Sequence, residues 1–537
     1  MKKITHVIAA LGTFLFLTGC GSIAPVISTP VENIDTSPLK VSDLTEAEKQ
    51  NWGHLDLVND TIPGMSVDKA YSEIIKKSKG QTVIVGVIDS GIDIDHEDLD
   101  ANIWTNRNEI PNNGKDDDNN GYVDDVHGWN FLGDGYNEQL EFVRILASGD
   151  TSNPLYASAK AEYEKEYQKW TERKAQYDQI YQQIKKADET LVKHFGKKDY
   201  TKQEVAAIKT EDPDLKQATQ IANYMYSNGV DSLGEALKEI EGDLESINDR
   251  LNYNLNKDFK GRVNGDDPTD MSTKFYGNGN VNPVKKSESH GTHVAGIIAA
   301  ERNNGKGANG VANNVKIMSI RTVPNGDEYD KDVALSIRYA VDNGAKVING
   351  SFGKSFSPNS EWVRDAIAYA GQKDVVFVHA AGNDSADVDT APNYPDDNVK
   401  GGPEVSDTYI RVGALFPKYG SNMVASFSNY GKNNVDVFAP GAQVYSTTPE
   451  NEYDTKGGTS MAAPAVAGVA ALIRSYYPDL TAAQVKKIIM DSGLALKTKV
   501  MVGGNSNDVR SFSELSKSGK IVNAYNALIM ASKLSNQ

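Results

Sequence analysis

Four short apolar runs alternate with stretches of helical periodicity, and this alternation constrains the fold more than any other feature of the chain. The runs are TVIVGVID (82–89), VKIMSI (315–320), AKVING (345–350) and VVFVHAAGN (375–383). Their nearly continuous branched and small side chains are typical of strands buried on both faces of a parallel sheet. Helical patterns at 332–344 and 361–372 lie between them. The order predicts an α/β fold with a doubly wound, mostly parallel sheet.

Three polar residues stand where such a sheet places its chemistry, near the carboxyl ends of the strands. Asp89 closes the first run, His290 opens SHGTHVAGIIAA, and Ser460 opens the helix in GGTSMAAPAVAGVAAL. Each has an ordinary structural alternative: a turn-capping aspartate, a metal pair with His293, or a helix N-cap. An aspartate, a histidine and a serine are the residue types of an orienting carboxylate, a general base and a nucleophile, so their occurrence together favours one catalytic site over three separate structural roles.

The segments around these residues resemble the signatures of the subtilisin-like serine proteases. NGSFG (349–353) is similar to the substrate-binding strand of that family, and AAGN (380–383) is similar to the segment with its oxyanion asparagine. Three more segments follow in the family's order: ASFSNYG (425–431), DVFAPG (436–441) and VYSTTPENEYDTKGGTSMAAP (444–464). The resemblance covers residues 65–135 and 262–537.

The resemblance implies a serine endopeptidase that hydrolyses peptide bonds in proteins through an acyl-enzyme intermediate. Ser460 would attack the peptide carbonyl, His290 would take and return the proton, and Asp89 would orient the imidazole. The Asn383 amide and the Ser460 backbone N–H would bind the oxyanion. The residues expected to bind the substrate are Ser351, Phe352, Gly353 and Gly382. Gly382, with Ala380 and Ala381, would line the pocket for the substrate residue before the cleaved bond, and these small apolar walls favour a hydrophobic or broad preference. No cofactor is expected for catalysis.

The helix that Ser460 opens contains almost nothing larger than valine. This composition predicts a helix that is buried on all sides and holds its first residues rigidly. The N-terminus of a helix favours developing negative charge, which suits a nucleophilic serine. Pro464 is placed in the first turn, where the N–H groups have no acceptor within the helix and a proline is tolerated. His293 is assigned to packing.

An acidic loop, NGKDDDNNGYVDD (113–125), has the alternating oxygen ligands of an EF-hand, with Gly121 at the tight turn. The expected calcium ligands are Asp116, Asp118, Asn120, the carbonyl of Tyr122, and Asp124. The final glutamate of an EF-hand is missing, and His127 stands in its place. Because related proteases often carry calcium loops of this composition, the resemblance favours a structural Ca2+ over the alternative of a solvated acidic turn.

Asp89 and His290 are 201 residues apart, several times the separation in a compact member of the family. The surplus, residues 138–261, is charged and poor in glycine, and its apolar residues recur at helical spacing. One set is Tyr163, Tyr167, Trp170, Tyr177, Tyr181, Ile184 and Leu191, and a second is Leu237, Ile240, Leu244, Ile247 and Leu251. We expect an inserted all-α helical bundle. Its tyrosine-rich face either packs within the bundle or docks a protein partner and covers the active-site cleft.

The N-terminus has the features of a bacterial lipoprotein signal. Two lysines precede an apolar run, residues 7–17, which ends in LTGC and is too short for an ordinary membrane span. Leu-Thr-Gly before a cysteine resembles a lipobox, so that residues 1–19 would be removed and Cys20 would be lipidated. A plain signal peptide is the alternative. The Pro/Ser/Thr-rich stretch 20–45 would be a flexible tether.

The net charge and the cysteine count of the chain restrict its binding partners and its disulfide bonds. The chain has 537 residues and a net charge of −17, which disfavours nucleic acid and anionic lipid as main partners. Cys20 is the only cysteine, so no disulfide can form within the chain. We expect a protease that is anchored by lipid to the bacterial cell envelope, at the outer membrane or the cell surface, with its catalytic domain in 46–137 and 262–537. Neither a large inhibitory prodomain nor a C-terminal binding module is expected. The alternative is a catalytically silent subtilase fold that binds other proteins through its helices.

Overall fold

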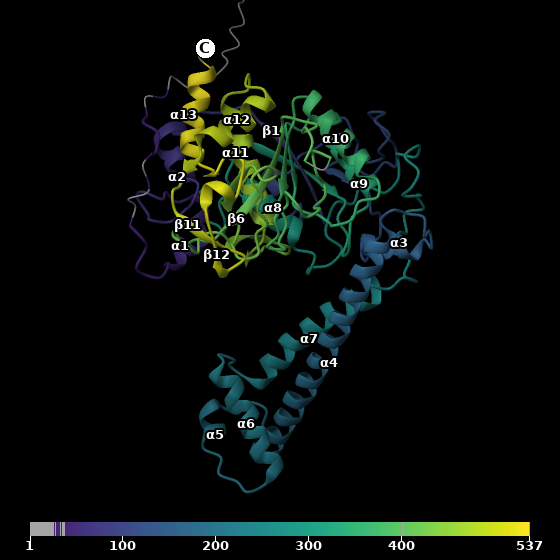
Figure 1. The fold of residues 1–537 in the computed structure, drawn as a ribbon, viewed down its shortest axis with the longest axis vertical. Helices are drawn as coiled ribbons and strands as arrows, with labels where there is room; N and C mark the ends of the chain where they lie inside the picture. Colours follow the sequence, from purple (N-terminus) through teal and green to yellow (C-terminus); the bar gives the residue numbers. More distant parts are fainter. Residues whose placement is uncertain (1–25, 27, 33, 35–37, 400, 536–537) are drawn as a thin grey trace, which may run out of the picture.

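A nine-stranded sheet forms the centre of the fold (Figure 1). The computed structural model describes residues 26, 28–32, 34, 38–399 and 401–535, so that the expected signal peptide and Cys20 lie outside the described residues. The strand order is β10-β13-β7-β6-β5-β4-β1-β3-β2, and all neighbours are parallel except β10 and β13. The prediction of an α/β fold with a mostly parallel sheet is confirmed.

The predicted apolar runs form four adjacent strands at the middle of this sheet. The strands of the sheet are β1 (Val83–Asp89), β2 (Gly128–Asn130), β3 (Val315–Arg321), β4 (Val347–Gly350), β5 (Val376–Ala380), β6 (Tyr409–Leu415), β7 (Val437–Pro440), β10 (Leu494–Ala495) and β13 (Lys520–Ile521). The run 375–383 continues beyond the end of β5, because Gly382, at a φ of +98°, turns the chain out of the sheet. Two hairpins lie outside the sheet: β8 (Val444–Thr448) with β9 (Glu452–Lys456), and β11 (Lys499–Val502) with β12 (Asn505–Ser511).

Helices cover both faces of the sheet. One face packs against α8 (His290–Ala299), α11 (Thr459–Tyr476), α12 (Ala482–Ser492) and α13 (Ala524–Ser535) through strand residues such as Val347 and Val412. The other face packs against α9 (Asp330–Asp342) and α10 (Ser360–Gln372) through residues such as Ile348 and Phe377. The two sets alternate along the strands, because successive side chains of a strand point to opposite faces.

Between β2 and α8 the chain forms an elongated helical projection, named here the helical arm (residues 138–261; Figure 1). Its helices are α3 (Glu141–Ala147), α4 (Tyr156–Phe195), α5 (Lys202–Ala206), α6 (Pro213–Ser227) and α7 (Leu233–Asp249). With 40 residues, α4 is about 60 Å long at 1.5 Å per residue. The Leu140 N–H donates to the Asn254 carbonyl over 3.0 Å, so that the two ends of the arm meet beside the domain.

The arm contains two separate apolar clusters. The base cluster comprises Leu140, Phe142, Val143, Ile145, Ala159 and Leu255, with Trp170 and Leu251 packed against it. The tip cluster comprises Ile184, Ala187, Leu191, Val205, Ala218, Ala222 and Leu233. Helices α4 and α7 run antiparallel: the guanidinium of Arg250, directly after α7, lies 5.6 Å from the centre of the Trp170 ring, and the Tyr181 hydroxyl donates to Glu241 over 2.6 Å.

The N-terminal segment follows the outside of the domain before β1. It contains α1 (Glu46–Asn51) and α2 (Val67–Ala70). Within the stretch expected to be a tether, Ile34 is buried, and Val31 exchanges hydrogen bonds of 2.8 and 3.0 Å with the Asn526 side chain on α13. Among the described residues, no helix combines the length and apolarity needed to cross a bilayer.

Candidate active site

Asp89 and His290 form a hydrogen-bonded pair between the end of β1 and the start of α8. His290 Nδ1 lies 2.7 Å from Asp89 Oδ1, which also accepts the Ser90 N–H over 2.8 Å. Asp89 is almost fully buried, whereas 39% of the His290 side chain is exposed. Because the carboxylate can only accept, Nδ1 carries the proton, and Nε2 is left as the free, basic nitrogen.

Small residues allow this close approach of helix and strand. A Cβ built on Gly291 would lie 2.2 Å from the Gly91 carbonyl oxygen and 3.2 Å from Asp89 Oδ1. A residue larger than glycine at this position would therefore push α8 away from β1 and lengthen the Asp89–His290 contact.

Ser460 is the only residue of α11 that is not buried. The helix begins at Thr459, one residue earlier than predicted, and Pro464 is its sixth residue. The placement of Pro464 in the first turn was therefore wrong. A proline at the sixth position removes the N–H that would bond to the carbonyl four residues earlier, which is that of Ser460. The freed Ser460 carbonyl instead accepts a hydrogen bond from the Ser351 hydroxyl over 2.8 Å, which connects the helix to the segment directly after β4.

The amide of Asn383 has one fixed orientation. Its Oδ1 accepts the Thr459 N–H over 2.8 Å and the Thr459 hydroxyl over 3.1 Å. Since a backbone N–H only donates, Oδ1 must face Thr459, and Nδ2 is left without an acceptor among the described residues. A Cβ built on Gly458 would lie 3.5 Å from Asn383 Nδ2 and 3.6 Å from the Ser460 nitrogen. Two N–H donors thus border one small space beside the Ser460 hydroxyl.

The residues predicted to bind substrate follow the ends of two neighbouring strands, and one of them contacts Ser460. Ser351, Phe352 and Gly353 continue from β4, and Gly382 follows β5, the neighbouring strand. The Ser460 hydroxyl lies 3.2 Å from the Ser351 carbonyl oxygen, to which it donates. Neither the N–H nor the C=O of Gly353 is bonded to any described residue. Gly353 is exposed, so that its backbone is available to an added strand.

The pKa values of two histidines near the site are shifted in opposite directions. Burial disfavours the charged form of His290, but the charge and hydrogen bond of Asp89 raise its pKa above the ordinary value, and the Lys456 charge opposes this rise. His293 is fully buried and donates from Nε2 to the Asp454 carbonyl over 3.1 Å. Burial lowers the pKa of His293 to about 3, so it is neutral and packs inside the domain.

A buried ion pair behind Asp89 was not predicted from the sequence. Arg321, at the end of β3, has no exposed surface and pairs with Glu288 over 3.0 Å. Its Nε also donates to the Ser90 carbonyl over 2.9 Å. Arg321 therefore connects the segment that follows Asp89 with the segment that precedes His290. A basic residue that ends an apolar strand run was the only sequence signal.

The acidic loop gathers three carboxylates that only partly match the predicted ligands. Glu109, Asp118 and Asp125 each bring an oxygen within 4.8 Å of the others, a spacing that can hold a metal ion. Burial raises the pKa of Asp125 to about 6, and the nearby Asp118 charge adds to the rise. A cation would relieve this crowding of buried negative charge, so the donor set fits a hard, oxygen-seeking ion.

The other predicted ligands have different contacts in this structure. The Asp116 carboxylate accepts the N–H groups of Asn120 and Gly121, and the Asp124 carboxylate accepts those of Asn113 and Gly114. The Asn120 side-chain amide donates to both Asp118 and Asp125. The Tyr122 ring packs in an aromatic cluster that includes Trp129 and Tyr339.

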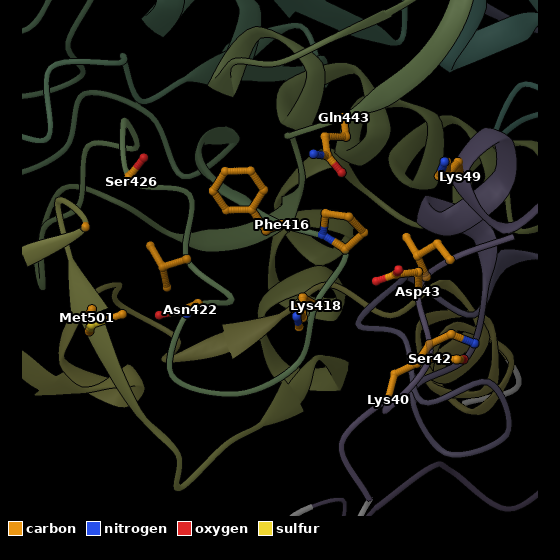
Figure 2. Close-up of a pocket in the computed structure, with 14 residues that line it drawn as sticks. Lys40, Ser42, Asp43, Lys49, Phe416, Lys418, Asn422, Ser426, Gln443 and Met501 are labelled. Atoms are coloured by element: carbon orange, nitrogen blue, oxygen red, sulfur yellow. The ribbon is translucent and has the colours of Figure 1, made fainter. Parts of the chain in front are cut away.

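A separate pocket of about 690 Å³ lies between the N-terminal segment and the loop that follows β6 (Figure 2). Lys40, Asp43, Phe416, Lys418, Gln443 and Met501 are among its lining residues. None of Asp89, His290, Asn383 and Ser460 lines it.

Comparison with known proteins agrees with this geometry. The Peptidase_S8 family, described as the subtilase family, matches residues 80–512. Thermophilic serine proteinase of Bacillus sp. (strain AK1) is 44% identical over 189 residues, which are 35% of this chain and 43% of that protein. Thermitase of Thermoactinomyces vulgaris is 40% identical over 197 residues, 36% of this chain and 64% of that protein. Subtilisin DY of Bacillus licheniformis is 40% identical over 198 residues, 37% of this chain and 67% of that protein. The chain thus spans less than half of the first relative and about two thirds of the other two. By the extent of the family match, the chain belongs to the subtilase family.

Proposed function

We propose that the protein is a serine endopeptidase that cleaves peptide bonds through the Asp89–His290–Ser460 triad. The observation that carries the proposal is the Asp89–His290 hydrogen bond of 2.7 Å, which leaves Nε2 of a partly exposed histidine free to act as a base. Ser460 supports it as the one accessible residue of a helix that is otherwise buried.

The proposed reaction assigns one task to each group. The Ser460 hydroxyl turns from the Ser351 carbonyl toward His290, loses its proton to Nε2 and attacks the peptide carbonyl. The oxyanion forms between Asn383 Nδ2 and the Ser460 N–H. His290 then donates the proton to the leaving amine, and water hydrolyses the acyl-enzyme by the same steps. Asp89 stabilises the imidazolium throughout.

Labelling with a fluorophosphonate probe tests the proposal directly. The wild-type protein should be labelled at Ser460 and should hydrolyse casein, and Ser460→Ala should do neither while melting at the wild-type temperature. A wild-type protein that is neither labelled nor proteolytic would favour the silent, binding form of the fold. Equal cleavage by wild type and Ser460→Ala would exclude Ser460 as the nucleophile.

We propose that Glu109, Asp118 and Asp125 hold a structural calcium ion. Calcium takes six to eight oxygen ligands, and the carboxylates and Asn120 supply oxygens of this kind. Asp116, Tyr122 and Asp124 remain predicted ligands, because their oxygens stand on the same loop. The ion would hold the loop beside the aromatic cluster around Tyr122, and it takes no part in the chemistry.

We further propose that Cys20 carries a lipid that anchors the protein in the bacterial cell envelope. The support is the apolar run 7–17 followed by LTGC in the sequence. The wild-type protein should partition into the detergent phase of Triton X-114, and Cys20→Ser should remain in the aqueous phase. If both forms remain in the aqueous phase, the N-terminus is a plain signal peptide and Cys20 carries no lipid.

The helical arm is, in this proposal, an insertion that limits which proteins reach Ser460. Its ends meet at Leu140 and Asn254, so that it leaves and rejoins the domain at one place. At its base, Glu141 pairs with the buried Lys354 ammonium over 2.7 Å, one residue beyond Gly353. The arm is therefore rooted beside the substrate-binding segment, where it obstructs large substrates more than small ones.

A further inference from the structure

A buried histidine lies behind the substrate-binding segment and takes no part in the triad. His379 stands on β5, where it is paired in register with Gly350 on β4 and with Arg411 on β6. It has no exposed surface. Its Nε2 lies 2.8 Å from the carbonyl oxygen of Phe352, and its Nδ1 lies 2.9 Å from the hydroxyl of Tyr409.

These two contacts determine which nitrogen carries the proton. Burial and the neighbouring Arg411 lower the pKa of His379 to about 3, so the ring is neutral and has a single N–H. The Phe352 carbonyl can only accept, so Nε2 must be the donor. Nδ1 is then an acceptor, and the Tyr409 hydroxyl must donate to it.

Arg411 allows the Tyr409 hydroxyl to donate its proton to His379, because it donates to the competing acceptor, the Pro395 carbonyl. That hydroxyl also lies 2.9 Å from the Pro395 carbonyl oxygen, which is a competing acceptor. The same carbonyl accepts a hydrogen bond from Arg411 Nη2 over 2.8 Å, so it is satisfied without the hydroxyl proton. A chain of donors thus runs from Tyr409 to His379 and ends at the Phe352 carbonyl.

The direction of the Phe352 carbonyl decides where the next amide points. The C=O of Phe352 and the N–H of Gly353 belong to one planar trans peptide unit, in which the two bonds point in opposite directions. Because the C=O points inward to His379, the N–H of Gly353 points away from the core. That N–H has no partner among the described residues. Glycine tolerates rotation of such a unit better than other residues, so the orientation needs an external restraint.

We propose that His379 is a positioning residue for substrate: by donating to the Phe352 carbonyl, it holds the Gly353 N–H in the direction where an extended peptide binds. The proposal rests on the proposed protease function. It adds a residue that touches neither the substrate nor the triad and acts through one peptide unit. Substrates long enough to pair with Gly353 depend on it, and substrates that contact only the catalytic centre do not.

Glutamine and asparagine at position 379 give a matched test, because the side-chain amide nitrogen of each takes the position of a different histidine ring nitrogen. The amide of glutamine reaches the position of a histidine Nε2, whereas the shorter asparagine amide reaches only the position of Nδ1. His379→Gln can therefore keep the donor to Phe352, and His379→Asn removes it. Both variants are assayed with a blocked tetrapeptide p-nitroanilide and with a blocked single-residue ester, and the rate of fluorophosphonate labelling is recorded.

His379→Asn should lower kcat/KM for the tetrapeptide about 10-fold, mainly through KM, as expected for the loss of one hydrogen bond. Its ester hydrolysis and labelling rate should stay within about 2-fold of wild type, and His379→Gln should recover most of the tetrapeptide activity. Equal losses on both substrates, or equal behaviour of the two variants, would overturn the proposal. A wild-type protein without labelling or hydrolysis would instead overturn the protease function.

A spectroscopic measurement does not depend on turnover. In the Ser460→Ala protein labelled with 15N-histidine, His379 should show a protonated Nε2 and an unprotonated Nδ1 across the neutral pH range. Tyr409→Phe removes the donor to Nδ1 and should allow the other tautomer to appear. A protonated Nδ1 in the Ser460→Ala protein would contradict the proposed donor chain, even if the His379 variants failed to fold.

Discussion

The Thr459 N–H donates a hydrogen bond of 2.8 Å to Asn383 Oδ1, and this bond turns Asn383 Nδ2 toward the space beside Ser460. Asn383→Ala should lower kcat by about 10²–10³, since one oxyanion donor is lost. Fluorophosphonate labelling should remain detectable, because the nucleophile and its base are unchanged. Steady-state kinetics with a peptide p-nitroanilide checks this expectation. A kcat within about 3-fold of wild type would remove Asn383 from the oxyanion site.

Gly458→Ala tests the same space from its other side. The added methyl would contact Asn383 Nδ2 at 3.5 Å and the Ser460 nitrogen at 3.6 Å, which are ordinary van der Waals distances. The φ of Gly458 is 160°, an extended value that alanine also adopts. The variant should therefore fold and melt like wild type, while its kcat should fall about 10²-fold because the methyl displaces the oxyanion. Loss of folding, or normal turnover, would show that the space is not arranged in this way.

Calcium should stabilise the folded protein through the acidic loop. At several hundred times Kd, a single site adds on the order of 3–4 kcal/mol to the free energy of unfolding. Asp118→Ala should abolish most of the rise in melting temperature that calcium produces, since Asp118 belongs both to the three-carboxylate cluster and to the predicted EF-hand pattern. Differential scanning fluorimetry with calcium and with EDTA measures the effect.

A second variant separates the two ligand sets. Asp116→Ala should keep most of the calcium response if the cluster with Glu109 and Asp125 holds the ion, because the Asp116 carboxylate caps backbone N–H groups instead. A complete loss of the response in Asp116→Ala would favour the EF-hand pattern. If neither calcium nor EDTA changes the melting temperature of the wild-type protein, the loop is a solvated acidic turn that binds no calcium.

The pH dependence of activity should reflect the raised pKa of His290. Only neutral His290 can act as the base, so kcat/KM should rise with pH through a pKa above the ordinary histidine value. Lys456 opposes this pKa rise by its charge, and Lys456→Met should move the acid limb of the profile to higher pH. The difference in pH between the two limbs should shrink in 1 M NaCl, because the Debye length is then about 3 Å and interactions between exposed charges over longer distances are screened. Lys418→Met, in the pocket of Figure 2, is the control and should leave the limb in place. A limb that moves to lower pH in Lys456→Met would contradict this electrostatic assignment.

Shortening the helical arm should alter substrate size selection without altering the chemistry. Replacing residues 177–244 by a short Gly/Ser turn removes the whole tip cluster and keeps the base cluster with Trp170 and Leu251. The cut joins α4 to α7 where the Tyr181–Glu241 and Trp170–Arg250 contacts show them to be antiparallel neighbours. Cleavage of a tetrapeptide p-nitroanilide should stay within several-fold of wild type.

Cleavage of folded proteins by the shortened enzyme should change much more than cleavage of the peptide. The ratio of the two rates, measured with casein, a folded protein and the peptide, is the readout. If both rates change alike, the arm has no role in substrate access. If the shortened enzyme does not fold, the arm belongs to the core of the catalytic domain.

The central strands and the Asp89–His290 pair were predictable because their signals are local. An apolar run closed by aspartate identifies β1 and Asp89, and the small-residue helices identify His290 and Ser460. The consequence of Pro464 was not predictable, because it depends on which residue begins the helix. Because the helix begins at Thr459, Pro464 is its sixth residue and leaves the Ser460 carbonyl without a partner in the helix. That carbonyl can then accept the hydrogen bond from Ser351.

The remaining contacts depend on long-range packing that no spacing reveals. Glu109 precedes the acidic loop and joins Asp118 and Asp125 only because the loop folds back on it. His379 is the only polar residue of β5, and its proposed role depends on Tyr409 and Phe352, which lie 30 and 27 positions away in the sequence.

From the two separate apolar clusters of the helical arm we expect more than one cooperative unit in the molecule. The tip cluster shares no residue with the base cluster or with the cores of the sheet. Local opening of the tip should therefore leave the sheet intact. Amide hydrogens at the tip should exchange through this local opening, whereas those of the central strands should exchange only on global unfolding. The free energy of opening at the distal end of α4 should therefore be independent of the free energy of unfolding that holds Asp89, His290 and Ser460 in place.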